Sequence, residues 1–195
     1  MIKIGITGGI GSGKTVVTSI LEVMGIPVYI ADEQSKRLTD TSPVIKEQLI
    51  ALFGATIYTS EGLNRGLLAS YIFNSADYLA RVNQIIHPEV NRHFLHWTQQ
   101  QQTTLCAIES AILFESGFDR IVDYSLMVYA PLALRIERAC RRDGVNREEI
   151  ERRINSQMPD EIKKERASFV VFNDNNQPLI PQIQEVITTL TPLTT

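Results

Sequence analysis

The sequence predicts a three-layer α/β fold, in which a mostly parallel sheet of five strands carries helices on both faces. Short runs of β-branched and other apolar residues alternate along the chain with stretches that repeat apolar residues at helical spacing. The chain opens with a strand pattern, a glycine-rich loop, a helix pattern and a second strand pattern, which predicts a right-handed parallel crossover. Residues 32–103 show helical patterns and little strand signal, so we expect a helical insertion between strands of the sheet.

The individual elements follow from these patterns. Strands are expected where the apolar runs are short, at 1–7, 26–31, 104–113, 124–130 and 169–172. Helices are expected at 16–24, 43–53, 65–73, 76–86 and 88–102, from 131 and 147 onwards, and at 180–190. Ser42, Ser75 and Asn146 are expected N-caps. Pro88 is expected to begin a separate helix, because proline is tolerated in a first turn and breaks a helix interior.

The composition of the 195-residue chain indicates a globular protein with one domain and inserted subdomains. The net charge of −3 argues against nucleic acid or an anionic membrane as the main partner. No apolar run approaches the roughly 20 residues that span a bilayer, and no signal-peptide pattern opens the chain. The two cysteines, Cys106 and Cys140, lack CxxC spacing and fit a reducing compartment. We therefore expect a cytoplasmic protein without an obligate protein partner.

The segment from Gly8 to Thr15 matches the phosphate-loop pattern G-x-x-x-x-G-K-[ST]. Its glycines let the backbone turn amide N–H groups inward, and these amides and the following helix N-terminus make a phosphate site. Lys14 can reach the outer phosphates of a nucleotide, and the Thr15 hydroxyl can coordinate the magnesium ion that bridges them. The alternative is a glycine-rich turn without a ligand, but a strand before and a helix after favour a P-loop NTPase fold. The predicted ATP-binding residues here are Gly9, Ile10, Gly11, Ser12, Gly13, Lys14, Thr15 and Val16.

Three carboxylates are candidates for proton transfer, metal binding or acceptor binding near the phosphate loop. Asp32 follows the second predicted strand, which we expect to neighbour the phosphate-loop strand, so it is placed to take a proton from an acceptor hydroxyl or to help hold metal. Its alternative role is a helix N-cap. Glu109 interrupts an apolar run, where burying an acid is costly unless the acid is paired or lies near a metal ion. It is placed to contact magnesium directly or through water. Its alternative role is an edge-strand or strand-end carboxylate without a ligand. Glu115 either faces the acceptor or only starts a helix.

Basic residues gather between positions 135 and 166, which hold ten of the 19 lysines and arginines and eight acids, a local charge of +2. Most of these charges are interpreted as solvated helix faces. Arg138 and Arg142 share one face, and a helix–turn–helix with arginines after a strand is typical of a lid that closes on transferred phosphate. His87 either sets a helix start with Pro88 or contacts ligand.

The combined pattern resembles the dephospho-CoA kinase family from end to end. The phosphate loop, the apolar-His-Pro signature and the Leu-Phe-Glu segment carry most of the resemblance. The matching segments are 5–15, Ala31-Asp32, Arg65 to Ile72-Phe73, Ile86-His87-Pro88, Glu109, Ile112 to Glu115, Arg138, Arg142-Asp143, Arg147, Gln157 and 170–173. Two positions depart from the family pattern. Ile30 stands where the family has the first Asp of Asp-Ala-Asp, and Ala111 stands where it has a proline.

The resemblance implies a kinase of three parts: a nucleotide-binding core (1–31, 104–134 and 167–195), a helical acceptor subdomain (32–103) and a lid (135–166). The implied reaction transfers phosphate from magnesium-ATP to the ribose 3′-hydroxyl of dephospho-CoA, the last step of coenzyme A synthesis. The implied roles can be grouped by function. They are catalysis by Asp32, Lys14 and Arg142, further ATP contacts from Arg138 and Arg142, acceptor contacts from Asp32, Lys36, Arg65, His87 and Glu115, and Mg²⁺ contacts from Thr15 and Glu109.

Two other readings stay open at this point. A P-loop kinase for another small acceptor, such as a nucleoside monophosphate, fits the same length, insertion and lid. A GTPase switch fits less well, because the sequence shows neither an N-K-x-D guanine-reading segment nor a D-x-x-G switch after a strand.

Overall fold

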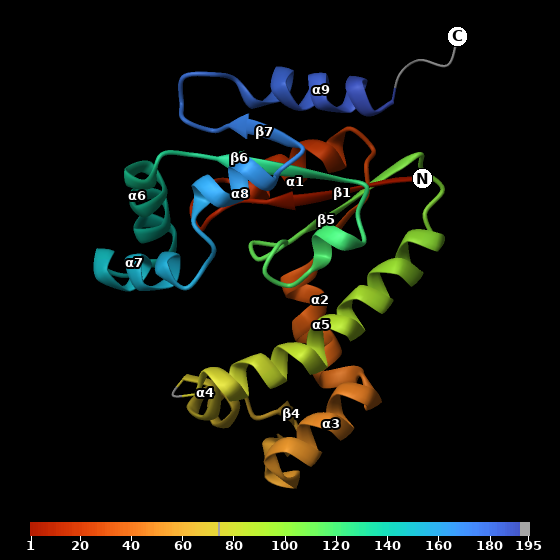
Figure 1. The fold of residues 1–195 in the computed structure, drawn as a ribbon, viewed down its shortest axis with the longest axis vertical. Coiled ribbons are helices and arrows are strands. Elements are labelled where there is room, and N and C mark those ends of the chain that lie inside the picture. Colours follow the sequence, from red (N-terminus) through yellow and green to blue (C-terminus); the bar gives the residue numbers. More distant parts are fainter. Residues whose placement is uncertain (74, 192–195) are drawn as a thin grey trace. The chain divides into compact units, whose positions relative to one another are not determined.

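The computed structural model describes residues 1–73 and 75–191. The larger of its two compact units is built around a five-stranded sheet (Figure 1). The strands lie in the order β2-β5-β1-β6-β7. Strand β1 pairs in parallel with β5 and β6, and β6 pairs in parallel with β7. The bounds are β1 (Ile2–Thr7), β2 (Val28–Ile30), β5 (Leu105–Glu109), β6 (Tyr124–Tyr129) and β7 (Phe169–Phe172). The predicted mostly parallel sheet is therefore confirmed.

Helices cover both faces of this sheet, as predicted. On one face, α1 (Lys14–Val23) and α9 (Leu179–Leu190) pack against Ile4 and Ile6 of β1 in one apolar core. On the other face, Gly5 leaves room for the Leu113 side chain from the segment after β5. That segment contains a short 3₁₀ helix, η2 (Phe118–Arg120). Helix α8 (Asp160–Arg166) lies on the opposite side of the sheet from α1 (Figure 1).

The expectation that the second strand neighbours the phosphate-loop strand is wrong. Strand β2 lies at an edge, and β5 lies between it and β1. All five residues of β5 are buried, whereas the three-residue β2 is only partly buried. A strand with a long apolar run is stabilised most in the middle of a parallel sheet, where both faces are covered. The strand with the stronger apolar run therefore takes the central place, although it comes later in the chain.

The segment after β6 folds into an arm of helices, α6 (Leu132–Asp143) and α7 (Arg147–Asn155), before the chain returns through α8. The two arm helices share a small apolar core of Ile136, Ala139 and Ile150, and Ile10 of the phosphate loop packs against it. Asn146 caps α7, since its side chain accepts a hydrogen bond from the Glu149 N–H at 2.9 Å. The predicted N-cap at Asn146, which is one half of the capping box, is thus confirmed.

Residues 30–100 form a second compact unit of their own. Its long helix α5 packs with α2, α3 and α4. The bounds are α2 (Ala31–Thr41), α3 (Pro43–Phe53), η1 (Ala55–Ile57), β3 (Tyr58–Thr59), β4 (Gly62–Leu63), α4 (Arg65–Phe73) and α5 (Ala76–Gln99). Ser42 and Ser75 cap α3 and α5 through their side chains, as predicted.

One sequence prediction fails in this unit, and two short strands were not predicted. Residues 76–99 form one helix with Pro88 in its interior, so Pro88 does not begin a new helix. A buried stripe of Val82, Ile86, Val90 and Phe94 continues at four-residue spacing across the proline, and its packing offsets the lost backbone hydrogen bond. The sequence also gave no sign of the two-residue strands β3 and β4, which pair antiparallel around a tight turn.

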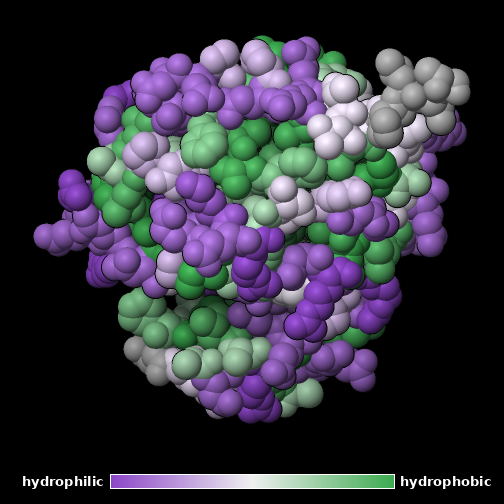
Figure 2. Space-filling model, turned by 45° about the horizontal axis from the view of Figure 1, so that its top comes forward, coloured by the Kyte–Doolittle hydropathy of each residue, from purple (hydrophilic) through white to green (hydrophobic). Residues whose placement is uncertain are grey.

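Figure 2 shows one face of the molecule, on which hydrophilic side chains surround separate hydrophobic patches. Within residues 1–73 and 75–191, no helix combines the length and apolar character that crossing a membrane requires.

Candidate active site

The phosphate loop lies at the carboxyl end of β1, between that strand and the N-terminus of α1. Gly11 and Gly13 have φ angles of 78° and 96°, in the left-handed region that favours glycine. The hydroxyl of Ser12 is fully buried and has no hydrogen-bond partner among the described residues. An unpartnered buried hydroxyl costs about 1–3 kcal/mol, which a ligand oxygen would recover. The loop is therefore built to receive a polar ligand.

Side chains from distant elements hold the loop carbonyls outward. Arg135 Nε donates to Ile10 O at 2.9 Å, and Asn173 Nδ2 donates to Ser12 O at 2.8 Å. In a planar trans peptide the C=O and the next N–H point in opposite directions. The N–H groups of Gly11 and Gly13 consequently face the opposite, inner side of the loop, where phosphate oxygens would bind.

The Arg135 contact explains why position 9 is a glycine, which the backbone conformation does not require. A Cβ at Gly9 would collide with the guanidinium of Arg135, although the φ of Gly9 is not positive. A Cβ at Gly13 would likewise collide with the amide of Asn173. Sequence reasoning did not single out Arg135 or the Asn173 contact. The helical spacing offered one weak signal, because Arg135 lies one turn before Ala139, which is buried on α6. An arginine on the buried face of a helix is unusual, since arginine side chains are mostly exposed.

Glu109 ends β5, beside the end of β1, and its carboxylate lies 3.7 Å from Lys14 Nζ. The residue is only 9% exposed, so its charge needs a cation nearby. Lys14 Nζ also donates to Gly8 O at 3.1 Å. Because β5 is the neighbour of β1, Glu109 is the acid at the end of the strand beside the phosphate-loop strand, a place that the sequence analysis predicts for Asp32.

The oxygen atoms near the loop fit a magnesium ion. Thr15 supplies a hydroxyl in the first turn of α1, and Glu109 supplies a carboxylate at the end of β5. The described residues include no group of three His, Cys, Asp or Glu side chains that would hold a metal alone. Mg²⁺ is typically bound by one or two protein oxygens together with substrate phosphates and water, so this sparse oxygen set suits it.

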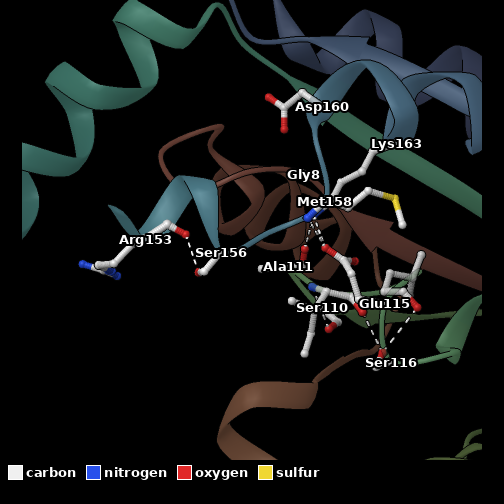
Figure 3. A network of polar contacts seen from close by, with 12 residues as sticks. Gly8, Ser110, Ala111, Glu115, Ser116, Arg153, Ser156, Met158, Asp160 and Lys163 are labelled. Atoms are coloured by element: carbon white, nitrogen blue, oxygen red, sulfur yellow. Dashed lines mark hydrogen bonds and ion pairs between the residues drawn. The ribbon is translucent and has the colours of Figure 1, made fainter. Parts of the chain in front are cut away.

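Glu115 belongs to a polar network that links the segment after β5 to α8 and the residues just before it (Figure 3). Its Oε1 accepts from the Met158 N–H at 2.8 Å and lies 3.1 Å from Lys163 Nζ. Lys163 is fully buried and also donates to Ala111 O at 2.6 Å. Burial lowers the pKa of Lys163, while the Glu115 carboxylate opposes that shift. Glu115 therefore ties the returning segment before α8 to the segment after β5, and an acceptor contact by it stays a prediction.

The two predicted lid arginines lie in different surroundings. Arg138 donates to Asn173 O at 2.9 Å and to Asn175 Oδ1 at 2.7 Å, next to the amide that holds Ser12. Arg142 instead bonds the carboxylate of Asp143 through two nitrogens, and Arg153 bonds the same carboxylate at 2.7 Å. Both arginines lower the pKa of Asp143. The side chain of Arg142 is 60% exposed, which leaves it accessible to a ligand.

The predicted acceptor residues other than Glu115 lie in the 30–100 unit. Asp32 is exposed in the first turn of α2, whose N-cap is Ile30, so the alternative role of Asp32 as an N-cap is wrong. Lys36 follows one turn later, and Arg65 Nη2 donates to its carbonyl at 3.2 Å. Arg65 also forms an ion pair with Asp40 at 2.7 Å, which lowers the pKa of Asp40. The unit thus brings Lys36 and Arg65 together.

We expect this unit to lose stability when the pH falls below neutrality. Burial lowers the pKa of His87 below the usual 6.5, and burial lowers that of His93 as well. A histidine whose folded pKa is depressed resists protonation in the folded state, so its penalty is absent above pH 6.5 and grows as the pH falls through that value. Urea unfolding between pH 7.5 and 5 should show this decline, and His87→Gln should reduce it. His96→Gln, at an exposed position of α5, removes only the last of the causes that lower the pKa of His93, so it should change the decline much less. An equal effect at both positions would contradict the assignment to His87.

Comparisons with known proteins add independent findings. A family model described as dephospho-CoA kinase matches residues 2–178. A dephospho-CoA kinase of Bacteroides fragilis is 56% identical over 187 residues, which cover 95% of this chain and 91% of that protein. One from Porphyromonas gingivalis is 47% identical over 191 residues, covering 97% and 95%. The crystal structure of TT1252 from Thermus thermophilus superposes with a TM-score of 0.85 at 34% identity, covering 97% of this chain and 98% of the other.

Proposed function

The chain belongs to the dephospho-CoA kinase family and catalyses the last step of coenzyme A synthesis, and we propose that the phosphate loop is the centre of that reaction. The substrates of the family are ATP and dephospho-CoA. The observation that carries the proposal is the preformed loop, with its carbonyls held outward, its buried Ser12 hydroxyl, and Lys14 at 3.7 Å from the Glu109 carboxylate. Such a site binds the phosphates of ATP before any chemistry takes place.

Lys14 is the proposed electrostatic catalyst. Its ammonium lies between the loop and Glu109, where it can stabilise the negative charge that develops on the transferring phosphoryl group. Thr15 and Glu109, the latter directly or through water, are the proposed holders of Mg²⁺. When bound, that ion would neutralise charge on the outer phosphates. The loop residues from Gly9 to Val16 would then supply backbone contacts to ATP.

Asp32 is the proposed general base for the ribose 3′-hydroxyl. It comes two residues after the end of β2, and ligands of open parallel sheets bind outside the carboxyl ends of the strands. We assign acceptor binding to the 32–103 segment through Lys36, Arg65 and His87, and to Glu115. The free cysteines Cys106 and Cys140 agree with a cytoplasmic location for this reaction.

The 135–166 segment is the proposed lid, with Arg138 and Arg142 directed at ATP. Arg142→Ala should lower kcat by about 10³-fold and weaken ATP binding much less, because an arginine of this kind stabilises charge in the transition state. Arg153→Ala is the matched control, since Arg153 bonds the same carboxylate of Asp143 and is also exposed. Steady-state kinetics of both variants would decide the matter. Equal losses would mean that only the shared ion pair matters.

A coupled ADP-release assay tests the proposed function as a whole. The protein should release ADP from ATP when dephospho-CoA is present, and it should do so far more slowly with nucleoside monophosphates. Identification of coenzyme A by mass spectrometry would fix the product. Turnover with a nucleoside monophosphate and none with dephospho-CoA would overturn the proposal.

A further inference from the structure

Arg135 is a buried cation that touches the phosphate loop from outside. It is only 3% exposed, and arginine is almost never fully buried unless it is paired. Its Nε holds Ile10 O at 2.9 Å, and its guanidinium fills the space beside Gly9. Its own backbone carbonyl lies so close to Gly11 that a Cβ there would collide with it. Arg135 therefore contacts three successive residues of the loop.

The charge of Arg135 is balanced by Asp160, with which it forms an ion pair. Asp160 is the first residue of α8, where the arm of α6 and α7 returns to the sheet, whereas Arg135 lies in the first turn of α6, where the arm leaves it. The pair thus closes the base of the arm. One turn further along α8, Lys163 anchors the same segment to Ala111 and Glu115 (Figure 3). Lys163 thus ties the start of α8 to the segment after β5, and Asp160 of the same helix ties Arg135 to it.

We propose that Arg135, held by Asp160, is a positioning residue for phosphoryl transfer, which aims the Gly11 N–H at the outer phosphates of ATP by holding the Ile10 carbonyl. The Gly11 N–H can point into the loop only while the preceding carbonyl points out of it. The pair also links the arm to the loop, because Ile10 packs its side chain into the core of α6 and α7. A shift of the arm therefore reorients the peptide that binds the phosphates.

Burial energetics support a functional role for this pair. Replacing a buried ion pair by apolar residues of similar volume is often neutral or stabilising, so a buried arginine and aspartate are a poor choice for stability alone. An apolar side chain at position 135 would fill the space but could not hold the Ile10 carbonyl. The guanidinium supplies its Nε–H to the loop and an Nη1–H to Asp160 in a fixed planar geometry.

The test separates the loop contact from the charge. Arg135→Lys keeps a cation for Asp160 and removes the Nε–H that holds Ile10. We expect kcat to fall by about 100-fold, as for a misplacement near the reacting atoms, with the KM for dephospho-CoA within about twofold of wild type. Asp160→Asn changes no residue that contacts the loop but removes the charge that holds Arg135, so it should also lower kcat. The double variant should be no slower than Arg135→Lys alone, because both changes act through one contact. Arg141→Lys, on the exposed side of α6 and paired with Glu137, is the control.

Several results would overturn the inference. One is a kcat of Arg135→Lys within twofold of wild type, another is a loss of activity no larger than the loss of folded protein, and a third is additive effects of the two substitutions. If Arg135→Lys does not fold, an unchanged kcat in Asp160→Asn overturns it alone. The inference rests on the proposed function, since it takes the loop to be the ATP site. Failure of that function would leave the wild-type protein inactive with dephospho-CoA, whereas failure of this inference alone would leave wild type and Arg135→Lys equally active.

Discussion

Lys14→Ala should reduce turnover of dephospho-CoA by about 10³-fold or more while leaving the fold intact. The Lys14 ammonium lies at the mouth of the phosphate loop, 3.1 Å from Gly8 O and 3.7 Å from the Glu109 carboxylate. Charge that develops on the transferring phosphoryl group is stabilised there by a fixed cation in a mostly water-excluded site. Alanine removes that cation. Water molecules that take its place must reorient as the charge develops, so they stabilise the transition state less. The coupled ADP-release assay at saturating substrates measures the loss.

Lys3→Ala is the matched control for this experiment. Lys3 belongs to β1, the strand that leads into the phosphate loop, and its ammonium pairs with Asp123 near the start of that strand. An exposed pair of this kind contributes about 0–1 kcal/mol to stability, so its loss should leave kcat unchanged. Circular dichroism and thermal unfolding would show that both variants fold. Near-normal turnover in folded Lys14→Ala would refute the assignment of the phosphate loop as the catalytic centre.

Asp32→Asn should lower kcat by about 10²–10⁴-fold, with ATP affinity and thermal stability little changed. The acceptor is a sugar hydroxyl, which is a poor nucleophile at neutral pH. A carboxylate within hydrogen-bond reach orients it and takes its proton as the bond to phosphorus forms. Asparagine keeps the size and much of the hydrogen bonding of Asp32 but lacks the basic oxygen. Because Ile30 and not Asp32 occupies the N-cap of α2, this change removes no capping hydrogen bond.

Glu33→Gln provides the comparison. Asp32 and Glu33 are both exposed acids in the first turn of α2, so each gains about 0.3–1 kcal/mol from the helix dipole and each substitution loses it. A difference between the two variants in kcat is therefore catalytic rather than structural. Turnover in Asp32→Asn equal to that of wild type and of Glu33→Gln would remove Asp32 from the mechanism. Glu115 would then be the next candidate base.

The sequence by itself determined the features that depend on neighbours in the chain. The phosphate loop, from Gly8 to Thr15, is one contiguous motif whose conformation follows from its glycines, and the structure has it between strand and helix as expected. The caps at Ser42, Ser75 and Asn146 are equally local, because a cap bonds an N–H three residues ahead. Alternating strand and helix patterns were enough for the fold class, since a layered α/β fold is the arrangement that buries them all.

The tertiary structure alone decided which distant residues meet. Strand order depends on which strand gains most from central burial, so β5 separates β2 from β1 and puts Glu109, not Asp32, beside the end of the phosphate-loop strand. The run of helix α5 through Pro88 depends on packing along its buried stripe, which outweighs the local cost of proline. The contacts of Arg135 and Asn173 with the loop join residues more than 120 positions apart, and no local pattern marks them. Sequence periodicity records which face of an element is buried, but it does not record the partner against which that face is buried.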